Sequence, residues 1–162
     1  MNKKWMIWMI AFGVVLLSLA VLAACSSAKP TAESESAAGE ECTEIPKPDN
    51  AGAVGAAVGL TGDATAGATI FADKCAVCHG DQGKGGVANP GAEEPTVPEL
   101  NPIDACMKNA DAKTYATNID LFIEWGTQLE GATKNMPAFG QQAVLTQQQI
   151  ADVIAYVISL NK

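Results

Sequence analysis

The feature that most constrains this chain is the run Cys75-Ala76-Val77-Cys78-His79, in which two cysteines three residues apart are followed directly by a histidine. This spacing is typical of covalent attachment of a c-type haem. On a helix the two thiols lie about one turn apart, so they can add to the two vinyl groups on one edge of a porphyrin. The adjacent imidazole is then available as an axial ligand of the iron. The motif therefore predicts one covalently bound haem c, attached through Cys75 and Cys78 and ligated by His79.

Paired cysteines also occur in zinc ribbons and in thioredoxin-like redox proteins, and each alternative makes demands on the rest of the chain. A zinc site needs two more ligands at similar spacing. His79 is the one histidine in the sequence, and Cys25, Cys42 and Cys106 each stand alone. A thioredoxin-like pair is expected within a βαβ unit, and no such pattern surrounds Cys75. The sequence favours haem attachment over both alternatives.

The N-terminus has the pattern of an export signal. Lys3 and Lys4 precede an uncharged apolar stretch that ends in Leu22-Ala23-Ala24-Cys25. This ending resembles the lipobox of bacterial lipoproteins, which implies cleavage before Cys25 and a lipid on its thiol. The alternative is an uncleaved signal anchor, because about 20 apolar residues can span a bilayer. We expect a lipoprotein signal peptide at 1–24 and a domain on the outer face of the cell membrane, anchored at Cys25.

Residues 26 to about 61 are rich in Ala, Ser, Glu, Gly and Pro and contain no aromatic residue. Such a composition predicts a flexible linker, so we divide the chain into a lipid-anchored linker at 25–62 and a folded domain at 63–162. The small, uncharged residues 51–60 are expected to continue the linker, with docking on a partner subunit as the alternative. In an oxidising compartment, Cys42 and Cys106 are expected to form a disulfide.

Charge limits the classes of partner. The chain after Leu22 has 8 lysines against 18 acidic residues, which gives a net charge of −10, and the whole sequence has no arginine. Nucleic-acid binding depends mainly on basic side chains, so we expect no nucleic-acid partner. An acidic surface instead suits a basic protein partner.

Apolar periodicity predicts helices at about 64–75, 118–128 and 146–160. Thr146 and Gln149 form a capping box at the start of the last of these helices. Before it lies Asn135-Met136-Pro137-Ala138-Phe139-Gly140, a loop whose methionine is not required for helical packing. A thioether is a soft ligand suited to haem iron, so Met136 is the candidate sixth ligand. Met107 is its rival.

Four blocks of the chain together resemble class I mono-haem cytochromes c of bacteria, over about residues 63–162. The blocks are Gly67 to Phe71, the motif at 75–80, Met136 to Gly140, and Leu145 to Leu160. The resemblance implies an all-α fold with three to five short helices around one covalently bound haem. It also implies that the first and last helices cross, with Gly67 and Phe71 against the Tyr156 side of the last helix.

The same resemblance implies roles for further residues. Pro98 would offer its carbonyl to the ring N–H of His79, and Pro90 and Pro95 are nearby competitors. Because the chain has no arginine, other donors must meet the haem propionates. The candidates are backbone amides and the side chains of Trp125, Asn135 and Lys134. Residues 101–117 are longer and more polar than compact members of the family need, and we interpret them as an insertion for partner binding or for a disulfide.

These residues predict a one-electron carrier and not an enzyme. With both His79 and Met136 bound, the iron has no open position for a small-molecule substrate. The expected partners are redox proteins, as a mobile shuttle or as a fixed subunit of a membrane respiratory or photosynthetic complex. The layout is similar to the mono-haem lipoprotein subunit of alternative complex III type assemblies. The alternative function is a haem-based peroxidase or gas-binding module with a displaceable sixth ligand. Such a module usually needs a distal acid or base. The chain has no second histidine to serve as one.

Overall fold

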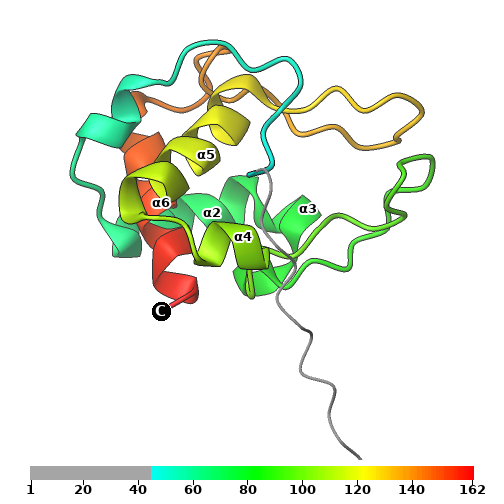
Figure 1. Ribbon diagram of the computed structural model, residues 1–162, viewed down its shortest axis with the longest axis horizontal. Coiled ribbons are helices and arrows are strands. Elements are labelled where there is room, and N and C mark those ends of the chain that lie inside the picture. The colour runs from blue at the N-terminus through cyan, green and yellow to red at the C-terminus, as the bar shows by residue number, and fades with distance from the viewer. Residues whose placement is uncertain (1–44) are drawn as a thin grey trace, which may run out of the picture. The chain divides into compact units, whose positions relative to one another are not determined.

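The computed structural model describes residues 45–162, and this part of the chain is helical (Figure 1). The α-helices are α2 (Ala64–Lys74), α3 (Ala76–His79), α4 (Ala105–Lys108), α5 (Ala112–Trp125) and α6 (Gln147–Leu160), with short 3-10 helices η1 (Ala56–Gly59) and η2 (Asp81–Gly83). Between residues 45 and 162 the only β pairing is an isolated antiparallel bridge of Ala88 with Thr96. The predicted all-α class is confirmed. None of the helices in this range is long and apolar enough to cross a membrane.

Helices α2 and α6 cross at Gly67. A Cβ atom at this position would lie 2.0 Å from the backbone carbonyl oxygen of Asp152, so only glycine lets the two backbones come this close. One turn later on α2, the rings of Phe71 and Tyr156 pack at 5.2 Å between centroids with a 58° tilt. The contact that the family resemblance implied between Gly67, Phe71 and Tyr156 is therefore confirmed.

Helix α6 has the start that its sequence predicts. The Thr146 hydroxyl accepts a hydrogen bond from the Gln149 N–H, and the Gln149 side chain accepts one from the Thr146 N–H. This capping box satisfies two backbone donors that a helix otherwise leaves free. The apolar face of α6 forms much of the core, through Ile150, Val153, Ile154 and Val157.

Helix α5 begins earlier than the sequence analysis placed it. The Asp111 side chain accepts hydrogen bonds from the N–H groups of Lys113 and Thr114, at 3.0 and 3.1 Å, and caps a helix that starts at Ala112. The prediction of a start near residue 118 is wrong because it followed the apolar residues and missed this cap. The helix ends at Trp125, where Gly126 adopts a φ of +66°.

Residues 45–62, which we call the N-terminal segment, pack against α5 and α6. Ala57 is 1% exposed. The N–H of Gly55 donates to Asp120 Oδ2 at 2.6 Å, and the N–H of Ala57 donates to Gln147 Oε1 at 2.8 Å. The prediction of a flexible linker as far as residue 62 is therefore wrong for this segment, which belongs to the domain. The signal peptide, Cys25 and Cys42 lie outside the described residues.

The predicted insertion at 101–117 contains α4 and the first turns of α5. Met107 on α4 is 2% exposed and belongs to the hydrophobic core. The Asn161 side chain accepts a hydrogen bond from the Ile103 N–H and donates one to the Leu100 carbonyl, so the insertion contacts the end of α6. Cys106 is in a disulfide, and its expected partner, Cys42, lies outside the described residues.

Candidate functional site

The two motif cysteines lie at the junction of α2 and α3. The Cys75 N–H donates to the Phe71 carbonyl at the end of α2. The N–H groups of Cys78 and His79 in turn donate to the Cys75 carbonyl, at 3.0 and 2.9 Å. The motif therefore forms a helical turn, which places the two cysteines one turn apart along it. This arrangement agrees with the spacing argument for attachment at two vinyl groups.

Both motif cysteines are free thiols, and Cys75 is buried while Cys78 is partly exposed. Burial, and secondarily the nearby Cys78, raise the pKa of the Cys75 thiol to about 11. Val77 between them is 72% exposed, so this face of the motif borders solvent. The motif therefore places Val77 at an edge of the domain that another protein can approach.

The imidazole of His79 faces the Pro98 carbonyl. Its Nδ1 lies 3.4 Å from that oxygen, and because a carbonyl only accepts, the contact assigns the ring hydrogen to Nδ1 and leaves Nε2 free to bind a metal. Burial lowers the pKa of His79, and the Pro98 hydrogen bond partly opposes this effect. A lowered pKa favours the neutral ring, which is the form that ligates metals.

A glycine-rich turn places Pro98 beside the histidine. The Gly85 N–H donates to the His79 carbonyl at 2.7 Å, and Gly85 has a φ of +66°. A Cβ at Gly85 would lie 2.7 Å from the backbone nitrogen of Glu99. The Gly86 N–H donates to the Val97 carbonyl, next to Pro98. Of the three prolines weighed, Pro98 is the one whose carbonyl the structure places at His79.

Met136 lies at the base of a loop formed by residues 126–136, the methionine loop. Its N–H donates to Thr127 Oγ1 at 3.0 Å, and its carbonyl accepts from the Thr127 N–H at 3.0 Å. The Gly126 backbone lies against the Met136 carbonyl. The Met136 side chain is partly buried and packs against the core, whereas Met107 lies fully within it, as expected of a packing residue.

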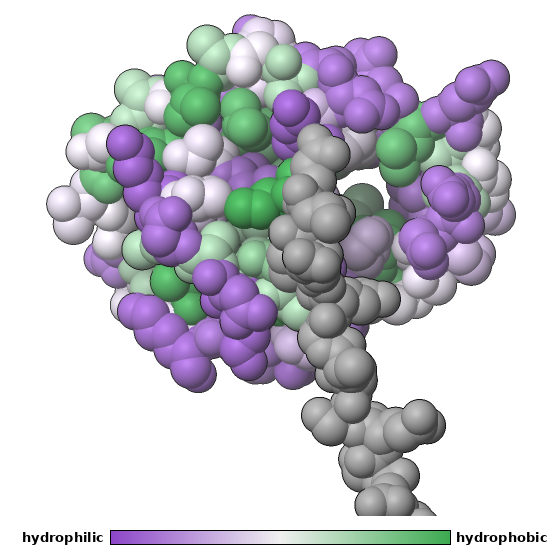
Figure 2. Space-filling view, viewed as in Figure 1, coloured by the Kyte–Doolittle hydropathy of each residue, from purple (hydrophilic) through white to green (hydrophobic). Residues whose placement is uncertain are grey.

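The methionine loop and the loop of residues 84–98, the histidine-side loop, extend together on the right of Figure 1. They meet where the Thr133 N–H donates to the Pro90 carbonyl at 3.2 Å. Figure 2 shows a hollow between this pair of loops and the helical part of the molecule, beside α3. The structure thus brings free thiols, an oriented imidazole and a thioether loop to the same side of the helical core.

A family model described as "Cytochrome c" matches residues 64–161. This chain belongs to the cytochrome c family. It carries one covalently bound haem c and is an electron carrier, as that family is. The match covers the domain from the start of α2 to the end of α6, and therefore includes every residue of the site.

Two curated proteins are similar in sequence to this cytochrome c. Cytochrome c6 of Rippkaea orientalis is 34% identical over 101 residues, which cover 62% of this chain and 73% of that protein. The "Cbb3-type cytochrome c oxidase subunit CcoP" of Cereibacter sphaeroides is 29% identical over 96 residues, 59% of this chain. The match spans only 30% of the oxidase subunit's length. No solved structure gave a match.

The residues present in this cytochrome c fit a covalent haem. The site offers two thiols for attachment, an imidazole with Nε2 free, and a thioether in a partly buried loop, which is the donor set of haem iron with histidine and methionine ligands. Cys75, Cys78, His79 and Met136 would hold the group. The hollow beside α3, between this pair of loops and the helical part of the molecule, would give it a place.

Two side chains proposed for the propionates already have partners. The Trp125 N–H donates to the Ala53 carbonyl of the N-terminal segment at 3.0 Å, so a propionate role would require this bond to break. The Asn135 Oδ1 accepts from the Leu129 N–H at 2.7 Å within the methionine loop. The ring of Trp125 also contacts the N-terminal segment, because a Cβ at Gly52 would lie 2.2 Å from it.

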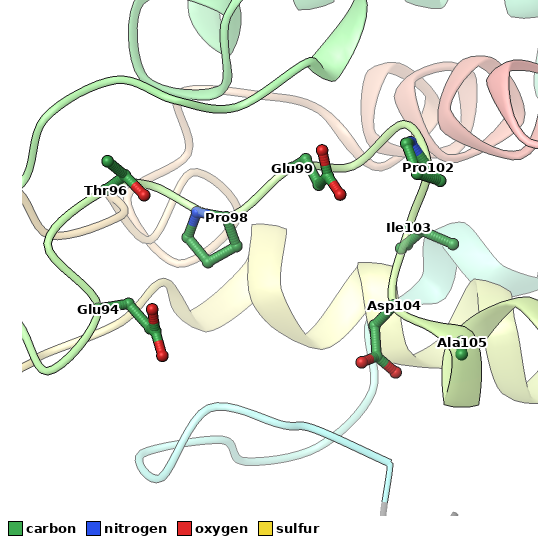
Figure 3. Close-up of a pocket in the computed structure, with 8 residues that line it drawn as sticks. All are labelled: Glu94, Thr96, Pro98, Glu99, Pro102, Ile103, Asp104 and Ala105. Carbon is green, nitrogen blue, oxygen red and sulfur yellow. The ribbon is translucent and has the colours of Figure 1, made fainter. Parts of the chain in front are cut away.

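A pocket adjoins the histidine side of the site (Figure 3). It includes Pro98, whose carbonyl meets His79, and its other lining residues are Glu94, Thr96, Glu99, Pro102, Ile103, Asp104 and Ala105. Three of the lining residues are carboxylates. Pro98 both lines this pocket and contacts His79, so the pocket lies next to the site. We interpret its three carboxylates as an acidic surface beside the site.

Four polar residues near the site were not predicted from the sequence. Thr127 binds both backbone groups of Met136, and Asn89 bridges the two loops through its side chain. Asp120 and Glu124 are buried at 0% and 6% exposure under the N-terminal segment. The spacing of Asp120 and Glu124 could have indicated them, because residues four apart in a helix lie on the same face. Thr127 and Asn89 stand in irregular loops with no periodic signal.

Proposed function

We propose that this cytochrome c is a class I mono-haem electron carrier, anchored on the outer face of a cell membrane through a lipid on Cys25. The observation that carries the proposal is the pairing of two potential axial ligands: His79, oriented by the Pro98 carbonyl, and Met136, fixed at the base of its loop by Thr127. When bound, the haem supplies a one-electron ferric–ferrous couple, and methionine ligation raises its potential.

The chain's own residues define how electrons enter and leave. The Val77 side chain, 72% exposed between the two attachment cysteines, marks the edge that a partner can approach. Three carboxylates, Glu94, Glu99 and Asp104, line the neighbouring pocket. Opposite charges steer two proteins together and increase the rate of encounter, so this edge suits a basic redox partner.

The proposed partner is a membrane respiratory or photosynthetic complex. One relative is by name a subunit of a cbb3-type oxidase, and the other is a cytochrome c6. A fixed subunit of an alternative complex III type assembly and an anchored shuttle are both compatible with a lipid anchor. Co-purification after mild detergent extraction separates them: a stoichiometric complex supports the subunit, and a lone cytochrome supports the shuttle.

Paired substitutions of the two methionines test the ligand assignment. Met136→Leu removes the thioether at nearly constant volume, and Met107→Leu makes the same change in the core. We expect the weak near-infrared thioether charge-transfer band of the ferric protein to vanish in Met136→Leu. The band should persist in Met107→Leu, which should lose less than about 1.5 kcal/mol of stability.

The opposite pattern would reject Met136 as the ligand. A pyridine haemochrome spectrum without a c-type band would reject the haem itself. Rapid carbon monoxide binding by the native ferrous protein would instead favour the peroxidase or gas-binding alternative. For the anchor, mass spectrometry of the membrane-extracted protein should show a lipid on an N-terminal Cys25, and an intact segment 1–24 would refute it.

A further inference from the structure

We propose that Asn89 is a positioning residue for the sixth ligand, and that its side chain holds the methionine loop closed against the histidine-side loop. The inference rests on the proposed ligation by Met136. Asn89 is 4% exposed, although it lies in a loop far in sequence from the residues it contacts. A buried polar side chain is stable only when its hydrogen bonds are satisfied, and those of Asn89 are satisfied by the methionine loop.

The Asn89 amide binds the methionine loop through both of its polar atoms. Its Nδ2 donates to the Lys134 carbonyl at 2.9 Å, and its Oδ1 accepts from the Lys134 N–H at 2.8 Å. The same Oδ1 accepts from the Thr133 hydroxyl at 3.2 Å. Asn89 therefore satisfies both backbone groups of Lys134, two residues before Met136. An asparagine is suited to this role because its side chain has both a donor and an acceptor.

Asn89 itself is fixed on the histidine side. Its N–H donates to the Pro95 carbonyl at 2.8 Å, and the adjacent Ala88 forms the antiparallel bridge with Thr96. The Val97 N–H also donates to the Val87 carbonyl at 2.7 Å, so residues 87–97 form a hairpin within the histidine-side loop. This hairpin leads directly into Pro98. The Asn89 side chain therefore joins the segment that orients His79 to the segment that carries Met136.

The methionine loop has a fixed base and otherwise depends on few contacts. Thr127 fixes the base by binding both backbone groups of Met136. Toward the tip, Gly131 adopts a φ of +76°, and Leu129 is 47% exposed. Glycine and exposed backbone permit local opening. One backbone hydrogen bond, from the Thr133 N–H to the Pro90 carbonyl, joins this end to the histidine-side loop. The Asn89 side chain makes three more, so we assign most of the closure of this end to Asn89.

Removing the Asn89 bridge should favour a state in which Met136 is detached. A single Lys134 backbone group left unpaired in the closed state shifts the open-to-closed equilibrium by roughly tenfold. An external ligand binds the iron only in the open state, so its apparent affinity rises in proportion to the open fraction while that fraction is small.

The test uses the full-length, haem-loaded protein in mild detergent, with imidazole as the external ligand of the ferric iron. Asn89→Asp keeps the acceptor but loses the donor to the Lys134 carbonyl. We expect apparent imidazole affinity to rise about tenfold, with the thioether band still present when no imidazole is added. Asn109→Asp controls for the added charge, because Asn109 is exposed at the end of α4. Ile150→Val controls for a general loss of stability. Both controls should keep the wild-type affinity.

Unchanged imidazole affinity in Asn89→Asp would overturn the proposal, as would an equal increase in Ile150→Val. If Asn89→Asp does not fold, amide hydrogen exchange of the wild-type protein decides. The Lys134 N–H should then exchange much more slowly than that of exposed Glu130, and equal rates would overturn the proposal. Absence of the thioether band from the wild-type protein would overturn the ligand assignment and this inference together. A wild-type band combined with unchanged variant affinity would overturn this inference alone.

Discussion

Replacing Gly67 with alanine tests the crossing of α2 and α6, which supports the attachment motif. The added Cβ would lie 2.0 Å from the Asp152 carbonyl oxygen, whereas real Cβ atoms essentially never approach closer than 3.0 Å. The two helices must therefore separate by about 1 Å at this point. Phe71 and Val153, both 2% exposed, lie in the core that these helices form, so the separation loosens packing beyond the mutated position.

The expected cost combines two opposing effects. Overpacking a core costs roughly 1 to 3 kcal/mol, and the upper end applies because a backbone carbonyl moves only with its helix. Alanine offsets about 1 kcal/mol of this through its better helix propensity. We therefore expect Gly67→Ala to lower the free energy of unfolding by about 2 kcal/mol, which for a domain of roughly 100 residues lowers Tm by about 8 to 16 °C.

Guanidinium unfolding of the haem-loaded protein measures this change. Gly59→Ala is the matched control, because nothing lies within 4 Å of a Cβ at Gly59. This control should be neutral or more stable by up to about 1 kcal/mol. If Gly67→Ala were as stable as Gly59→Ala, the close crossing of the two helices would be refuted.

Two further predictions concern the contact between α5 and the N-terminal segment. Burial raises the pKa of Asp120 above 3.8, and Glu124 adds to this effect while the hydrogen bond from Gly55 opposes it. The folded protein then holds this proton more tightly than the unfolded chain, so the free energy of unfolding falls as pH rises from 3.8 through the folded-state pKa. Asp120→Asn should make this fall shallower in urea titrations, and an unchanged slope would contradict the prediction. Trp125→Phe removes the indole donor to the Ala53 carbonyl and should cost about 0.5 to 1.5 kcal/mol. Faster amide exchange at Gly55 should accompany it, and unaltered exchange would show that the bond does not stabilise the segment.

The features that sequence predicted well depend on short spacings. The motif at Cys75 and Cys78 and the capping box of Thr146 involve neighbours within one helical turn, so their geometry follows from helix dimensions. The resemblance to a known family added contacts between distant residues, such as Pro98 with His79, which spacing alone does not give.

The N-terminal segment was missed because its composition gives no sign of its partners. Gly55 and Ala57 are small residues that usually favour disorder, since ordering glycine costs entropy. Their N–H groups bind Asp120 and Gln147, which lie 65 and 90 residues away in sequence. No local pattern encodes such long-range pairing. Asn89 was missed for the same reason, because its partners lie 44 and 45 residues further along.

Because the N-terminal segment is packed, the folded domain is longer than the region matched by the family model. The family match starts at residue 64, yet the buried Ala57 and the donor to Asp120 lie before it. A domain cut at the family boundary would leave that carboxylate without its backbone partner and would uncover the ring of Trp125. A shortened form of this cytochrome should therefore retain the chain from residue 45.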